Sequence, residues 1–254
     1  MSKKHKKKRR IRKGRLFIVI IGFLFIILLI LTLCYFVIKL IAPNFMIQEQ
    51  VDAIFQPKKI GTVVLDAGHG GYDEGSSSIE GYCEKDITLS ITLKTGKLLE
   101  NKNVKVVYTR KDDRALGNRQ GTDLHGRVNI SNAADADYFL SIHTNSSENF
   151  NDGAHGSEVW TMFINNANIA FANNINDELV KIKRNESRGV KDEANHPLTI
   201  LMYNQVPAAL VEVGFISDEE EKNYLMSKSG QNELADALSK GILKTLKQDK
   251  EKKD

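Results

Sequence analysis

The sequence predicts an α/β fold: a single domain with a mostly parallel sheet flanked by helices on both faces, preceded by one transmembrane helix. Two observations support this prediction. Strand-like apolar segments alternate with amphipathic helix-like segments from residue 60 to 246, as in a sheet covered by its crossover helices. Residues 16–38 carry no charge. A domain of about 185 residues buries roughly 70% of its unfolded surface and needs no disulfide. Because Cys34 lies inside the apolar run, we do not expect it to pair with Cys83.

Positive charge is concentrated at the amino terminus. Ten of the 36 Lys and Arg residues lie within residues 1–15, which leaves 26 basic against 32 acidic residues in the rest of the chain. The overall basic balance therefore gives no support for nucleic-acid binding by the folded part. We expect no nucleic-acid partner and interpret residues 1–15 as a basic cytoplasmic tail.

Residues 16–38 are the expected transmembrane anchor. As a helix, these 23 uncharged residues would span roughly 35 Å, more than the bilayer core of about 30 Å. The preceding Lys and Arg residues predict a cytoplasmic amino terminus and an extracytoplasmic location for the remainder. A cleaved signal peptide is the alternative. The apolar run is longer than a signal peptide requires and no small-residue cleavage site follows it, which favours an uncleaved, single-pass anchor in the cytoplasmic membrane.

The chain after the anchor divides into three parts. Residues 39–59 are a juxtamembrane connector with apolar residues at helical spacing, residues 60–246 are the folded domain, and residues 247–254 are a charged tail. The expected strands of the domain are 62–65, 105–108, 138–142, 158–162, 199–202 and 208–213. The expected helices are 87–100, 123–134, 168–182, 218–226 and 230–246.

Four ionisable residues are expected at one edge of the sheet. His69 follows the first strand in a glycine-rich corner, His143 follows the third strand, and Glu212 lies near the end of the last strand. Glu84 precedes the first helix, in the loop that starts at the same strand end as His69. Because open α/β sheets place their sites at the carboxyl ends of strands, these residues can meet.

Two histidines and a carboxylate are a suitable ligand set for one Zn²⁺ ion, with a fourth position open to water. Such an ion lowers the pKa of bound water to about 7 and polarises an amide carbonyl. His69, Glu84 and His143 are therefore candidate metal ligands. Glu212 is the candidate catalytic carboxylate, which would accept the proton of the water and pass it to the leaving amine.

Each of these residues also has a simpler interpretation. A histidine after a strand is more often a hydrogen-bonded loop residue than a ligand, and Glu84 could be an acidic residue favoured at a helix start. Glu212 differs, because an acid within an apolar strand is costly unless it is paired or functional. No HExxH motif is present, which excludes the zincin type of site. Cys83 is interpreted as a free thiol.

Four segments of the chain, in order, form a recognisable pattern: Val64–Gly71, Glu84–Asp86, Ser141–Asn145 and Val211–Ser217. This pattern resembles the zinc-dependent N-acetylmuramoyl-L-alanine amidases of the amidase-3 family. The resemblance runs from about residue 60 to 246. It implies a membrane-anchored bacterial cell-wall hydrolase that cleaves the amide between N-acetylmuramic acid and L-alanine in peptidoglycan. By position it makes His69, Glu84 and His143 the zinc ligands and Glu212 the catalytic carboxylate.

The sequence departs from the family pattern at a few places. Ala67 stands where the family usually has proline, and the stretch before residue 203 lacks an arginine often found there. Two other functions stay open: a zinc peptidase of the stem peptide, and a glycan-binding or regulatory wall protein. The expected partners are peptidoglycan, the membrane through one amino-terminal helix, and an activator or a protein of the divisome or of wall synthesis.

Overall fold

The computed structural model describes residues 13–41, 59–150, 152–184, 186–195 and 197–252. The chain divides into two compact units, residues 1–57 and residues 58–254. In the first unit, helix α1 (Lys13–Ile41) contains the stretch Ile18–Lys39, with a mean hydropathy of 3.1. It is long and apolar enough to cross a membrane. The helix expected within the connector lies outside the described residues.

The second unit is built on one six-stranded sheet with the strand order β2-β1-β3-β6-β4-β5. Strands β2, β1, β3 and β6 are parallel, whereas β4 runs antiparallel to β6 and parallel to β5. The mostly parallel sheet that the sequence predicts is thus confirmed. The strands are β1 (Gly61–Ala67), β2 (Val104–Tyr108), β3 (Tyr138–Asn145), β4 (Ser157–Thr161), β5 (Ser187–Asp192) and β6 (Ala208–Phe215).

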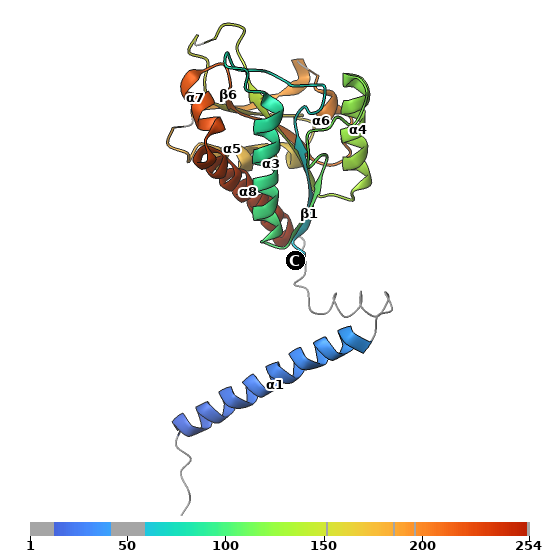
Figure 1. The fold of residues 1–254 in the computed structure, drawn as a ribbon, viewed down its shortest axis with the longest axis vertical. Coiled ribbons are helices and arrows are strands. Elements are labelled where there is room, and N and C mark those ends of the chain that lie inside the picture. The colour runs from blue at the N-terminus through green and yellow to red at the C-terminus, as the bar shows by residue number, and fades with distance from the viewer. Residues whose placement is uncertain (1–12, 42–58, 151, 185, 196, 253–254) are drawn as a thin grey trace, which may run out of the picture. The chain divides into compact units, whose positions relative to one another are not determined.

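Helices cover both faces of this sheet, as Figure 1 shows, with α3, α5 and α8 on one face and α4 and α6 on the other. Their bounds are α3 (Glu84–Glu100), α4 (Gln120–Ala133), α5 (Asn166–Leu179), α6 (Thr199–Met202), α7 (Glu219–Met226) and α8 (Lys228–Glu251). A short 3₁₀-helix, Glu193–Asn195, precedes α6. Helix α8 continues to Glu251, so it enters the segment 247–254 that the sequence suggested as a tail.

The core consists of two apolar layers, one on each face. Along β1, Val63 and Leu65 belong to the larger layer under α3, α5 and α8, whereas Val64 belongs to the smaller layer with Val128 of α4 and Ile200 of α6. Successive strand residues point to opposite faces, so a strand buried on both sides reads as a continuous apolar run. That run is the signal by which the sequence predicts β1, β3 and β6.

One predicted strand is wrong. Thr199–Met202 forms a single helical turn, α6, in which the amides of Leu201 and Met202 both donate to the carbonyl of Leu198. Ile200 and Leu201 are both buried. A four-residue apolar run fits a strand and a helical turn equally well, because periodicity needs more residues to distinguish them.

One strand, β5, was not predicted. It pairs with β4 at the edge of the sheet, and most of its residues are partly exposed. Its sequence, residues 187–192, contains one large apolar residue, Val190. An edge strand of this composition has no apolar alternation, so its place depends on pairing with β4 rather than on a local pattern.

Candidate metal centre

His69 lies in a tight corner directly after β1. Its backbone φ is +60°, and Gly70 and Gly71 follow at +130° and +62°. Left-handed conformations cost a non-glycine residue on the order of 1 kcal/mol and tend to occur at functional sites. Gly68, the preceding residue, lies so close to His143 that a Cβ at this position would be 2.6 Å from Nε2 of the His143 ring. The backbone of the corner therefore lies against the ring of a second histidine, His143, at Gly68.

Glu84 is the first residue of α3 and is almost fully buried. Its Oε2 accepts from the amide of Ser76 and its Oε1 from the amide of Thr144, both at 2.9 Å. Burial alone would raise the pKa of this carboxyl group, but the hydrogen bonds and charges of His143 and His69 outweigh it and hold the pKa far below its usual range. Glu84 is thus held as a carboxylate that faces both histidines.

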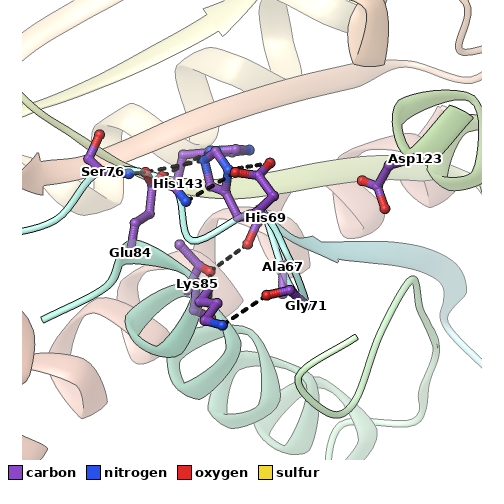
Figure 2. Close-up of polar contacts among 12 residues, drawn as sticks. Ala67, His69, Gly71, Ser76, Glu84, Lys85, Asp123 and His143 are labelled. Carbon is purple, nitrogen blue, oxygen red and sulfur yellow. Dashed lines mark hydrogen bonds and ion pairs between the residues drawn. The ribbon is translucent and has the colours of Figure 1, made fainter. Parts of the chain in front are cut away.

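His143, near the end of β3, completes the cluster (Figure 2). Its Nδ1 lies 3.0 Å from Glu84 Oε1, and Nε2 of His69 lies 3.2 Å from Glu84 Oε2. The two imidazole rings meet edge to face, with centroids 4.9 Å apart. One ligand atom from each of the three residues lies within 4.8 Å of the others. A tetrahedral zinc with bonds of about 2.1 Å separates its ligand atoms by about 3.4 Å, so this donor set fits zinc in chemistry and spacing.

Glu212 lies beside the cluster, as the register partner of His143 on the neighbouring strand β6. It lines one open, polar cleft together with His69, Glu84 and His143. Burial, with the negative charges of Glu84 and Glu158, raises the pKa of Glu212 to about 7. Among the described residues, its Oε2 is one of three buried side-chain oxygen or nitrogen atoms without a hydrogen-bond partner. Glu212 thus lines the cleft, where a proton acceptor is needed, although its Oε2 atom is itself buried.

The four residues singled out from the sequence therefore lie together in the structure. The comparisons with known proteins agree with the family resemblance of the sequence motifs that contain these residues. The family model described as N-acetylmuramoyl-L-alanine amidase matches residues 63–244. The chain belongs to this family. It is an N-acetylmuramoyl-L-alanine amidase, an enzyme that hydrolyses an amide of cell-wall peptidoglycan.

One curated relative and two solved structures resemble the amidase over most of their own length. The germination-specific N-acetylmuramoyl-L-alanine amidase of Bacillus subtilis is 30% identical over 190 residues, which cover 72% of this chain and 78% of that protein. The amidase AmiC2 of Nostoc punctiforme is 32% identical, with a TM-score of 0.68 and coverage of 75% and 99%. The amidase CwlD of Clostridioides difficile, solved in complex with the GerS lipoprotein, is 32% identical, with a TM-score of 0.67 and coverage of 74% and 98%.

Asp73 is a part of the amidase site to which the sequence alone assigned no role. Its Oδ2 lies 2.9 Å from Nδ1 of His69, and its Oδ1 accepts from the amide of Gly75. Burial lowers the pKa of His69, but contacts with Glu84 and Asp73 outweigh this effect and raise it to about 9 in the metal-free protein. A carboxylate on the second ring nitrogen of a metal-ligating histidine fixes its tautomer and orientation. The DxG spacing after the histidine was the signal that could have identified Asp73.

A second hollow adjoins the two histidines of the amidase on the α4 and α6 face. It has a volume of about 170 Å³, and its walls include His69, His143, apolar residues of both helices and the acidic Asp73 and Asp123. The site therefore opens on two sides that differ in character. One is the open polar cleft with Glu212, and the other is a narrower and more apolar hollow between α4 and α6.

Among the described residues, two further histidines and Cys83 lie outside the cluster. The rings of His125 and Tyr203 are tilted against each other by 55°, with centroids 5.4 Å apart, and His155 contacts Glu186 at the surface. His196 lies outside the described residues. Cys83 caps α3 next to Glu84, but its Sγ faces Ser77 and the carbonyl of Gly81. It is a free thiol in the structure, as the sequence predicted.

Proposed function

We propose that this amidase is zinc-dependent and cleaves the bond between the lactyl group of N-acetylmuramic acid and L-alanine, outside the cytoplasmic membrane. One observation carries the proposal: His69, Glu84 and His143 converge in the same cleft as Glu212. In this proposal residues 60–246 are the catalytic domain, and residues 16–38 anchor it with a cytoplasmic amino terminus. The basic residues before the apolar helix support that orientation.

His69, Glu84 and His143 would hold the zinc ion. A zinc ion so bound supplies an acidified water and polarises the amide carbonyl. Asp73 keeps the proton of His69 on Nδ1, so that Nε2 is free to face Glu84 and the cleft. The three ligands leave the cleft open for the substrate carbonyl, as catalytic zinc sites require.

Glu212 moves the protons. Its carboxyl group, on a residue that lines the cleft, accepts a proton from the attacking water and then donates this proton to the leaving nitrogen of L-alanine. A pKa of about 7 suits both steps, since a group that titrates near the operating pH can take up and release a proton with similar ease.

The test uses the full chain in detergent micelles and the variant Glu212→Gln. We expect the release of peptides from intact sacculi to fall by at least about 100-fold, while the zinc content stays at that of wild type. Glu220→Gln, at an exposed position of α7, is the matched control and should retain full activity. Unchanged activity of Glu212→Gln would remove Glu212 from the mechanism.

The products separate this proposal from its alternatives. An amidase leaves sugar strands without peptides, which mass analysis of the digested wall detects. A stem-peptide peptidase would leave L-alanine on muramic acid. A glycan-binding or regulatory role would instead be indicated by full function of His143→Ala in cells.

A partner protein is also part of the proposal. The relative CwlD was solved in complex with a lipoprotein, and we infer that this chain too works with an activator or with a protein of the divisome or of wall synthesis. Purified protein that binds zinc but does not digest sacculi, and that becomes active on addition of a membrane extract, would support this inference. Full activity of the purified chain would contradict it.

A further inference from the structure

Arg110 is a fully buried arginine that follows β2 and lies under the metal centre. All the hydrogen bonds that the structure gives its guanidinium end on uncharged oxygens. Nε donates to the carbonyl of Ala67 at 3.0 Å, and Nη1 donates to that of Asp112 at 3.1 Å. Nη2 donates to the carbonyls of Gly68 and Lys85 at 2.8 and 2.7 Å and contacts the hydroxyl of Thr88 at 3.3 Å.

The two carbonyls that accept hydrogen bonds from Nη2 belong to residues adjacent in sequence to two candidate metal ligands. Gly68 directly precedes His69, and Lys85 directly follows Glu84. These ligands belong to different elements, the corner after β1 and the first turn of α3 (Figure 2). A single nitrogen atom of Arg110 thus links the backbones that carry them. Thr88 strengthens this link, because its hydroxyl also donates to the carbonyl of Gly68, at 2.9 Å.

A second buried arginine, Arg127 of α4, provides a useful contrast. It donates to the carbonyls of Ala67 and His69, both at 2.6 Å, and forms ion pairs with Asp66 and Asp123. Its charge is therefore compensated by direct carboxylate partners. The contacts of Arg127 hold the corner to β1 and α4, whereas those of Arg110 hold the corner to α3.

The buried position of Arg110 is unfavourable for its positive charge, but it allows the guanidinium to orient the backbone of the site. Burying a cation without a carboxylate partner is unfavourable, and burial together with the nearby charge of Arg127 lowers the pKa of Arg110. A positive charge beneath a cation site adds a further repulsion. The planar guanidinium, however, presents several donors at fixed angles, and these donors reach carbonyls of the corner and of α3 at the same time.

We propose that Arg110 is a positioning residue, which fixes the distance between His69 and Glu84 so that the metal centre is formed before the ion binds. This inference rests on the proposed zinc-dependent function. Without Arg110, fewer hydrogen bonds would join the left-handed corner to the start of α3, those of Thr88 to Gly68 and of Lys85 to Gly71 being among the ones that remain. Zinc would then have to hold its ligands in place at the expense of affinity. Arg110 acts through the backbone and touches neither the ion nor the substrate.

The experiment measures metal binding rather than activity. Full-length wild type, Arg110→Met and Arg110→Lys, in detergent micelles and stripped of metal, are titrated with Zn²⁺ against a chromogenic chelator. The visible absorption of the Co²⁺ forms reports the ligand geometry. Arg114→Met is the matched control, because the Arg114 side chain is 57% exposed and contacts Asp112 only at the surface.

We expect Arg110→Met to bind Zn²⁺ about 10- to 100-fold more weakly than wild type, the usual effect of losing a residue that orients metal ligands. Its Co²⁺ absorption should also be weaker and shifted. Arg110→Lys should be intermediate, since an ammonium can contact one of the two carbonyls but lacks the planar fork. Arg114→Met should stay within about twofold of wild type, as surface substitutions usually do.

A folded Arg110→Met protein with wild-type zinc affinity and Co²⁺ absorption would overturn the inference, even if its melting temperature fell. If neither Arg110 variant folds, Thr88→Val is measured in their place. This variant removes one hydrogen bond to Gly68 and keeps the side-chain shape. Unchanged zinc affinity of that variant would overturn the inference, and a severalfold loss would support it. His143→Ala serves as the reference for a protein that lacks one metal ligand. If wild type bound zinc no more tightly than this variant, the proposed zinc-dependent function would itself be contradicted.

Discussion

Asp73 Oδ2 lies 2.9 Å from Nδ1 of His69, on the side of the ring opposite Nε2, the nitrogen that faces Glu84. This contact makes Asp73 the group that fixes the tautomer of the first candidate ligand. Asp73→Asn keeps the shape but removes the charge, so we expect zinc affinity to fall by about 10- to 100-fold. Competition with a chromogenic chelator measures this loss. Glu74→Gln, at the exposed neighbouring position, should bind as wild type does, and equal affinities for both variants would contradict the role of Asp73.

Gly68 gives His143 the space that it occupies. A Cβ at residue 68 would lie within 3 Å of three atoms of the His143 ring. Gly68→Ala should therefore displace the ring, lower the free energy of unfolding by roughly 1–3 kcal/mol, and abolish high-affinity zinc binding. Thermal unfolding and metal analysis measure the two effects. Gly121→Ala is the control, because a Cβ on that residue of α4 meets nothing within 4 Å. Retained zinc affinity in Gly68→Ala would show that the ring can move without loss.

Asp66 is expected to make the stability of the metal-free protein dependent on pH in the acid range. Burial would raise the pKa of Asp66, but the charge of Arg127 and the hydroxyls of Ser141 and Thr109 outweigh it and lower the pKa. A carboxyl group with a lowered folded-state pKa stabilises the fold above its unfolded pKa of about 4, and this contribution is lost as the pH falls through the folded value.

The variant Asp66→Asn tests this dependence. With EDTA present, it should be less stable than wild type at pH 7 by about 3 kcal/mol, because it breaks a buried ion pair. The difference should shrink as the pH falls below about 4. Urea unfolding at several pH values measures it. A difference that is constant between pH 7 and pH 3 would contradict the role of the ion pair.

The membrane anchor can be tested without the enzyme activity. The alternative to an anchor is a signal peptide that is removed. With tags at both ends of the chain, we expect one full-length species that carries both tags and stays in the membrane pellet after alkaline carbonate washing. Leu24→Arg and Leu28→Arg together place two charges in the middle of the apolar stretch, each costing about 3 kcal/mol in a bilayer, and should release the protein. Loss of the amino-terminal tag from wild type would favour the signal peptide.

Much of this site follows from local patterns, and the rest depends on long-range contacts. His143 and Glu212 come at the ends of buried strands whose apolar runs are strong signals, so their meeting at one sheet edge was predictable. The Thr199–Met202 turn was not, because four apolar residues fit either a strand or a helix. Arg110 carries no local signal of its position under the site, since its partners Gly68 and Lys85 are distant in sequence.

Glu158 lies opposite Glu212 on the antiparallel pair β4 and β6. It is buried and accepts hydrogen bonds from Asn145, Trp160, Arg188 and Lys191. Its negative charge is one of the causes that raise the pKa of Glu212, after burial and the charge of Glu84. Glu158→Gln removes this charge and leaves two cations less compensated, so the pKa of Glu212 should fall.

If Glu212 must be deprotonated to act as a base, the acid limb of the pH–activity profile of Glu158→Gln should move to lower pH. Initial rates of peptide release from sacculi between pH 5 and 9 measure this shift. Glu186→Gln is the control, because the Glu186 side chain is 80% exposed and contacts His155 at the surface. If the acid limb of Glu158→Gln stays in place or moves to higher pH, the charge of Glu158 does not control the pKa of the base. If Glu186→Gln shows the same shift to lower pH, the cause is a change in general surface charge.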